Sequence, residues 1–157
     1  MVGNGIFTSK LIYLIPLWGG AEGYLIRILQ VIQNKAAKYI TKRGPETSTL
    51  ERLNECGWLS VPQLITYHSL LLLQKSVLAK GPTYIQKMFN VNYPRDTRLA
   101  SSGCIRVSKP KANLSLTMMS FKWRASAEYN RLPAELRKET DVAKFKKAVK
   151  EWVAKNN

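Results

Sequence analysis

The chain has 157 residues, of which 45% are hydrophobic, and it carries a formal net charge of +15 at pH 7. This length fits a single domain, and the apolar content excludes a globally disordered chain, which combines low hydrophobicity with high charge. The positive charge attracts polyanions, so nucleic acid is the first class of partner that we expect. A single run of charge is more often a solvated face, but here the excess of cations extends along the whole chain.

Other broad classes are disfavoured by the cysteines and by the N-terminal stretch. Cys56 and Cys104 are far apart and outside any Cys-x-x-Cys spacing, so we expect reduced thiols rather than disulfides or a zinc site. No secretory signal is recognisable, which favours an intracellular protein, nuclear or cytoplasmic, over a secreted one. The longest apolar run, 11–18, is well short of the roughly 20 residues that a membrane helix needs. A membrane surface, for which 144–155 loosely qualifies, is the weaker hypothesis.

The first predicted elements are helical. Residues 10–17 are apolar on every side and end at Pro16 and the Gly19-Gly20 pair. Apolar residues at spacings of three and four predict an amphipathic helix over Gly23–Thr41. The predicted inward face holds Leu25, Ile28, Leu29, Ile32, Ala36 and Tyr39. The predicted outward face holds Arg27, Gln30, Gln33, Asn34, Lys35 and Lys38.

Two more helices and a short helical piece follow. Ser48 or Thr49 can cap a short helix that ends at Gly57, so that a helical hairpin forms with the preceding helix. Ser60 is a good N-cap for a long, mostly buried helix over 64–79, which Gly81-Pro82 ends. Residues 83–89 make one or two further turns.

The remaining third of the chain begins with an irregular stretch. Residues 90–117 predict a long basic arm, in which the extended pieces 103–107 and 113–116 could pair as a short β-hairpin. A helix over 120–130 must stop at the Leu132-Pro133 break, because proline keeps the preceding residue out of the helical conformation. A turn over 133–137 follows. Asp141 then caps a closing helix, whose apolar face holds Val142, Phe145, Val149, Trp152 and Val153. We therefore expect a mainly α protein, a small bundle of four to six helices with an irregular basic arm.

Five short motifs, each occurring once, follow one another along the chain in a recognisable order. They are WGG at 18–20, LQVIQNKA at 29–36, SFKWRA at 120–125, YNRLP at 129–133 and FKKAVKEWV at 145–153. Together they resemble the C-terminal region of non-LTR (LINE-type, jockey-like) retrotransposon polyproteins, over about residues 10–153. In that family the region follows the palm and thumb of the reverse transcriptase.

The resemblance implies an organisation for the chain. Residues 1–20 would be a fragment of an upstream thumb helix, and the start of the chain a truncation. In a single helical domain over 1–157, residues 21–90 would form the bundle, 91–117 the arm and 118–157 the closing helices. An upstream reverse-transcriptase domain would be a partner.

Catalytic chemistry is not predicted. The family's aromatic-x-Asp-Asp motif is absent, because the only aspartates are Asp96 and Asp141. His68 is the sole histidine and falls in a leucine-rich helix, where a packed or half-exposed side chain is expected rather than a catalytic base. The acids are scattered singly and no phosphate-binding glycine loop occurs. We expect no enzyme activity in this chain, and no metal, cofactor or small-molecule substrate.

Binding of nucleic acid needs cations for phosphates and flat side chains for unstacked bases. The first predicted set comprises Tyr93, Arg95, Arg98, Arg106, Lys109, Lys111, Lys122, Trp123 and Arg124. The second set comprises Lys35, Lys38, Lys42 and Arg43. Structural alternatives stay open: Phe121 and Trp123 as core aromatics, Arg124 paired with Glu128, and the second set placed to suit a helix C-terminus.

The sequence leaves more than one function open. The first hypothesis is a non-catalytic accessory domain of a retrotransposon reverse transcriptase, which grips the backbone of the RNA template or the target DNA along a contiguous cationic groove. The alternative is a protein-interaction or scaffold remnant that completes a polymerase thumb and binds no nucleic acid. An exposed apolar surface around Leu11 to Leu17 would favour that alternative. A degenerate copy without a cellular role is a third hypothesis.

Overall fold

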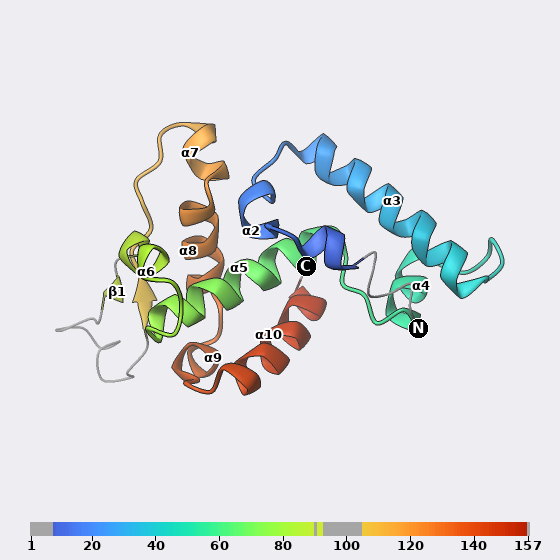
Figure 1. Ribbon diagram of the computed structural model, residues 1–157. Helices are drawn as coiled ribbons and strands as arrows, with labels where there is room; N and C mark the ends of the chain where they lie inside the picture. Colours follow the sequence, from blue (N-terminus) through green and yellow to red (C-terminus); the bar gives the residue numbers. More distant parts are fainter. Residues whose placement is uncertain (1–7, 90, 93–104, 157) are drawn as a thin grey trace. The chain divides into compact units, whose positions relative to one another are not determined.

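The computed structural model describes residues 8–89, 91–92 and 105–156. This part of the chain is mainly α-helical, as predicted (Figure 1). It divides into two compact units, the first running to Ile65 and the second from Thr66 to Asn156, so that the boundary falls within one helix. More helices form than the four to six predicted, because short stretches at 15–18, 83–88, 115–119 and 134–138 each close helical turns of their own. None of the described helices is long and apolar enough to span a bilayer.

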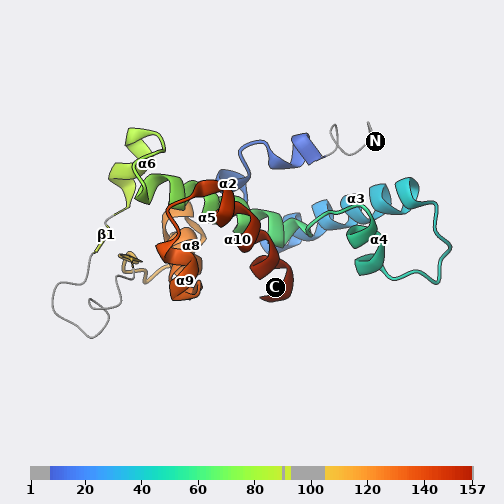
Figure 2. The same ribbon diagram turned by 90° about the horizontal axis from the view of Figure 1, so that it is seen from below.

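The first unit is built on a helical hairpin. A turn of helix at 8–12 and α2 (Ile15–Trp18) precede α3 (Gly23–Thr41). Helix α4 (Thr49–Glu55) folds back beside the C-terminal part of α3, as both views show (Figures 1 and 2). The chain then enters α5 (Val61–Val77), whose first residues belong to this unit. The predicted hairpin is therefore present.

The inward face of α3 differs from the prediction, although its bounds are those expected. Gln33 and Ala37 are the buried residues of this helix, whereas Ile28 and Ile32 are about half exposed and Tyr39 is 85% exposed. The side-chain amide of Gln33 donates to the carbonyl oxygen of Leu59 at 2.8 Å, which satisfies a buried polar group. The outward assignment of Gln33 was thus wrong, because this glutamine has a backbone partner just before α5. Arg27, Lys35 and Lys38 are exposed, as predicted.

The helix ends follow the capping chemistry expected from the sequence. Ser48 and Glu51 form a reciprocal capping box at the start of α4, and Gly57 takes a left-handed conformation (φ 69°) just after that helix. Ser60 and Gln63 bond reciprocally at the start of α5. Asp141 accepts a hydrogen bond from the backbone N–H of Ala143 at 2.8 Å, next to the start of α10. These local signals fix the starts of α4, α5 and α10 and the end of α4.

The second unit contains the rest of α5 and all later elements. They are α6 (Thr83–Met88), β1 (Val91–Asn92), β2 (Arg106–Val107), α7 (Ser115–Met119), α8 (Phe121–Arg131), α9 (Ala134–Lys138) and α10 (Val142–Asn156). Most of its fully enclosed side chains come from α5, α8 and α10. They include Leu70, Leu73, Tyr129, Phe145, Val149 and Val153.

The described ends of the arm are partly regular. Strands β1 and β2 pair antiparallel, with Val91 opposite Val107, so one of the two predicted extended pieces is present at 106–107. The other, at 113–116, was wrong: Ser115 begins helix α7. The straight-chain residues Leu116, Met118 and Met119 favour helix over strand.

A sharp break separates α8 from α9, as predicted. Leu132 lies in an extended conformation (ψ 145°) directly before Pro133, which begins the next turn of chain. The stretch after Pro133 is the short helix α9 rather than a simple turn. We call residues 120–137 the elbow.

Candidate functional site

Side chains of the elbow fasten the returning end of the arm through hydrogen bonds to its backbone. The side chain of Asn130 both accepts from the Val107 N–H at 3.2 Å and donates to its carbonyl oxygen at 2.9 Å. Arg137, which is buried, donates to the carbonyl oxygens of Ile105 at 3.2 Å and Leu132 at 3.0 Å. Asn130 and Arg137 therefore hold strand β2 against the elbow.

One contact brings together two residues of the first predicted set. The ammonium group of Lys109, from the arm, lies 4.1 Å from the centre of the Trp123 ring, from α8. Arg106, Lys109 and Lys111 are exposed, whereas Lys122 and Trp123 are partly buried. We call these five residues the arm-elbow surface. It combines cations with one indole, the side-chain types that bind phosphates and bases.

Arg124 has a structural setting within the same helix. Its Nε donates to the carbonyl oxygen of Met119 at 2.9 Å, across the junction between α7 and α8. Burial lowers the pKa of this guanidinium from its ordinary value. The carboxylate of Glu128, which the sequence offered as a partner for Arg124, accepts from Arg131 at 2.9 Å.

Phe121 packs edge-to-face against Phe89, with ring centres 5.7 Å apart. The structure thus supports the core interpretation of Phe121. Tyr93, Arg95 and Arg98 lie outside the described residues.

The second predicted set lies in the first unit, at the end of α3. Lys35, Lys38, Lys42 and Arg43 are all exposed, and together with Tyr39 they line an open pocket of about 440 Å³. Lys42 takes a left-handed conformation (φ 52°) and ends the helix. Tyr39 was expected to face inward, so the sequence did not identify it as part of this surface.

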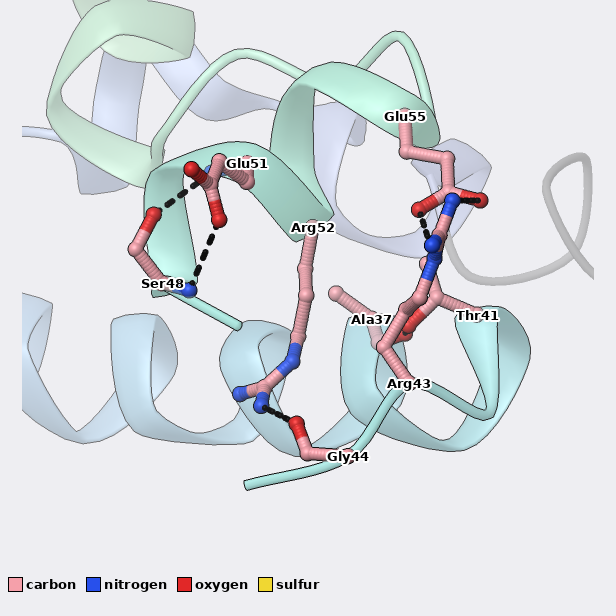
Figure 3. A network of polar contacts seen from close by, with 8 residues as sticks. All are labelled: Ala37, Thr41, Arg43, Gly44, Ser48, Glu51, Arg52 and Glu55. Carbon is pink, nitrogen blue, oxygen red and sulfur yellow. Dashed lines mark hydrogen bonds and ion pairs between the residues drawn. The ribbon is translucent and has the colours of Figure 1, made fainter. Parts of the chain in front are cut away.

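Polar contacts from α4 hold the turn that follows α3 (Figure 3). Arg43 pairs with Glu55 through two contacts of 3.1 and 3.4 Å, and both side chains remain largely exposed. Arg52 reaches from α4 and donates to the carbonyl oxygen of Gly44 at 2.7 Å. The exposed ion pair contributes little by itself, but it occupies the guanidinium of Arg43. Lys35, Lys38 and Lys42 are left as the cations that can meet a partner.

A third group of cations was considered only for a membrane surface and was not predicted to bind nucleic acid. Helix α10 buries Phe145, Val149 and Val153 and exposes its lysines. These are Lys144, Lys146, Lys147, Lys150 and Lys155. The same count of charge could have identified them. Exposed lysines of this helix offer changes of charge that match those made on the other surfaces.

Other reactive groups have ordinary surroundings. Within the described ranges, no three His, Cys, Asp or Glu residues come close enough to hold a metal ion. His68 is partly buried, with its ring edge-on to Tyr67 at 5.1 Å, and burial together with Lys146 lowers its pKa. Burial and the neighbouring Glu55 raise the pKa of the Cys56 thiol.

Comparison with known protein families, curated proteins and solved structures finds no match for this chain. Because the arm-elbow surface and the Lys35 to Arg43 set belong to different units, we treat them as two separate surfaces.

Proposed function

We propose that the chain binds the backbone of RNA or DNA through the arm-elbow surface. In this proposal it is a non-catalytic accessory domain derived from the C-terminal region of a non-LTR retrotransposon polyprotein, and it acts in the nucleus or cytoplasm beside a reverse-transcriptase domain. The contact between Lys109 and Trp123 is the observation that carries the proposal, because it joins a cation of the arm to an aromatic ring of the elbow.

The chemistry of this contact suits a nucleic-acid strand, which presents both phosphates and bases. A cation over an indole is worth only about 0.5–1 kcal/mol at an exposed site, so Lys109 can exchange the ring for a phosphate at little cost. The face of Trp123 then becomes available to an unstacked base. Arg106 and Lys111, both exposed, add phosphate contacts on the same returning segment.

Salt dependence of RNA binding tests the proposal. We expect the affinity for a short RNA hairpin to fall linearly, on logarithmic scales, between about 50 and 200 mM salt. The variant Arg106→Ala/Lys109→Ala/Lys111→Ala removes three cations and should reduce the slope by about 2 to 3. A flat binding curve for the unmodified chain would sink the proposal.

A matched variant tests whether the binding is local. Lys144→Ala/Lys147→Ala/Lys150→Ala removes the same charge from exposed positions of α10. It should change the slope much less than the arm variant does. Equal effects would mean that diffuse charge attracts the RNA and that the arm-elbow surface has no special part.

Trp123→Phe and Trp123→Ala separate stacking from charge. Loss of a stacking ring costs about 1–3 kcal/mol per base, without a change in the number of neutralised phosphates. We expect Trp123→Ala to weaken binding while leaving the salt slope unchanged, and Trp123→Phe to retain most of the affinity. Circular dichroism of both variants checks that α8 remains folded.

An exposed apolar segment favours the second candidate function, a protein-interaction or scaffold role beside a polymerase thumb. Around α2, Tyr13 is 73% exposed and Leu17 is 66% exposed. Such side chains commonly mark a surface that meets another protein. If RNA binding is absent at low salt, this candidate replaces the first.

A further inference from the structure

The outward face of α3 carries an uninterrupted set of apolar side chains. Its N-terminal half presents Tyr24, Leu25, Ile28, Val31 and Ile32, each between 40% and 58% exposed. The other side of the helix faces the unit through Gln33 and Ala37. These five apolar residues therefore lie on a face that their own unit leaves largely uncovered.

The exposed residues have the spacing of a coiled-coil seam. Tyr24, Ile28, Val31, Lys35 and Lys38 follow one another at intervals of four, three, four and three residues. Beside them, Leu25, Ile32 and Tyr39 recur every seven residues on the same side. We call these eight residues the α3 seam. This spacing lets a second helix pack along α3 with its knobs between these side chains.

Charge divides the seam into two halves. The positions from Tyr24 to Ile32 are apolar, whereas Lys35 and Lys38 occupy the next two seam positions and Lys42 follows directly after the helix. Each of these lysines is exposed, and neither of the two ion pairs found among the described residues involves them. A helix that covers the seam must therefore bring apolar residues to one half and acids to the other.

A second copy of this chain is a poor occupant. In a parallel pair, the lysines at 35 and 38 would face their own counterparts, and like charges repel. In an antiparallel pair, these lysines would be buried against Tyr24 and Ile28, where Glu22 is the one nearby acid in the sequence. Nucleic acid would meet the lysines and Tyr39 but would leave Ile28 and Val31 uncovered.

We propose that the α3 seam docks an amphipathic helix of another protein, one that carries apolar residues at heptad spacing and Asp or Glu opposite Lys35 and Lys38. The apolar half supplies the burial, and the ion pairs fix the orientation and register of the bound helix. This site is separate from the arm-elbow surface and goes beyond nucleic-acid binding.

Two synthetic peptides test the seam directly. Both are about three heptads long, with Leu and Ile at the apolar positions. One carries Glu at the seam positions of one end and the other carries Lys there. We expect the Glu peptide to bind the full chain at least about tenfold more tightly, by fluorescence anisotropy, with a difference that shrinks as salt is added. Equal affinities would overturn the proposal.

Variants of the chain locate the binding. Ile28→Asp places a charge in the apolar half and should abolish binding of the Glu peptide, while circular dichroism checks that the helix content is retained. Lys35→Glu/Lys38→Glu should reverse the preference between the peptides. The matched variant Lys144→Glu/Lys147→Glu changes the charge equally on α10 and should not reverse it. Reversal by the α10 variant, or unchanged binding by Ile28→Asp, would contradict the proposal.

Competition separates this site from nucleic-acid binding. The variant Arg106→Ala/Lys109→Ala/Lys111→Ala should bind the Glu peptide as the unmodified chain does, since its changes lie in the other unit. If instead a short RNA displaces the peptide, and Lys35→Glu/Lys38→Glu abolishes RNA binding, the seam is a nucleic-acid site and the docking proposal fails.

Discussion

Helix α3 buries a glutamine and leaves isoleucines half exposed, whereas helix α8 fully buries a large aromatic side chain, Tyr129. On α3 the buried residues are Gln33 and Ala37, and Ile28 and Ile32 face outward. On α8, Ala125 and Tyr129 are fully buried. The tyrosine hydroxyl donates to Gln74 at 2.6 Å, and Gln74 in turn donates to the carbonyl oxygen of Glu139 at 2.7 Å.

The difference shows that backbone partners, as well as apolar area, decide which face of a helix is covered. The first N–H groups of α5 have no partner within their own helix. Gln30 of α3 accepts from the Val61 N–H at 2.8 Å, and Gln33 donates to the Leu59 carbonyl at 2.8 Å. The two glutamines therefore complete the start of α5 from a neighbouring helix. Their hydrogen bonds direct Gln30 and Gln33 inward and leave Ile28 and Ile32 half exposed.

The largest expected effect comes from removing the elbow tyrosine. Tyr129→Ala deletes a fully buried aromatic side chain together with its hydrogen bond to Gln74, and should lower the free energy of unfolding by about 3–5 kcal/mol. Tyr39→Ala is the matched change on α3, where the ring is 85% exposed, and should stay within about 0.5 kcal/mol. Urea denaturation measures both.

Tyr129→Phe separates the contribution of the buried ring from that of the hydroxyl group's hydrogen bond. It keeps the ring but leaves the Gln74 oxygen without this donor, which costs about 1–3 kcal/mol for a buried group. A loss for Tyr39→Ala as large as that for Tyr129→Ala would mean that α3 is covered on both sides, and the contrast between the helices would not hold.

A smaller effect is expected from truncating either of two neighbouring residues on α3, one buried and one half exposed. Gln33→Ala removes a buried amide and leaves the Leu59 carbonyl oxygen without this donor, so we expect a loss of about 2 kcal/mol. Ile32→Ala, at a half-exposed position, should cost less than Gln33→Ala. Denaturant midpoints of the two variants decide the order. The reverse order would restore the face that hydrophobic periodicity alone predicts.

Much of the fold could be predicted because its signals are local. The bounds of α3, the caps at Ser48 and Ser60 and the break before Pro133 each depend on a few adjacent residues. The inward face of α3 depends instead on carbonyl and amide groups near residue 60, which lie far along the chain. Periodicity cannot indicate such a partner, so the helix was predicted correctly and its orientation was not.

The candidate site was predictable to a similar degree. Composition indicated the cations and rings, and the contact of Lys109 with Trp123 joins two of them. Sequence reasoning did not anticipate that Asn130 and Arg137 would fasten the arm to the elbow, because both bind backbone groups more than 20 residues away. It also placed Tyr39 in the core, since an aromatic at helical spacing usually packs inward.

The smallest expected effect concerns the stability of the second unit at low pH, to which His68 contributes. Burial and the nearby Lys146 lower the pKa of this imidazole below its ordinary value of about 6.5, so the unfolded chain takes up the proton at a higher pH than the folded chain does. Its contribution to stability is therefore present above about pH 6.5 and is lost as the pH falls through that value towards the folded pKa. His68→Gln should reduce the loss of stability between about pH 7.5 and 5.5, measured by urea denaturation, because it removes the titrating group. If the loss is the same in both proteins, other groups carry the acid sensitivity of the unit.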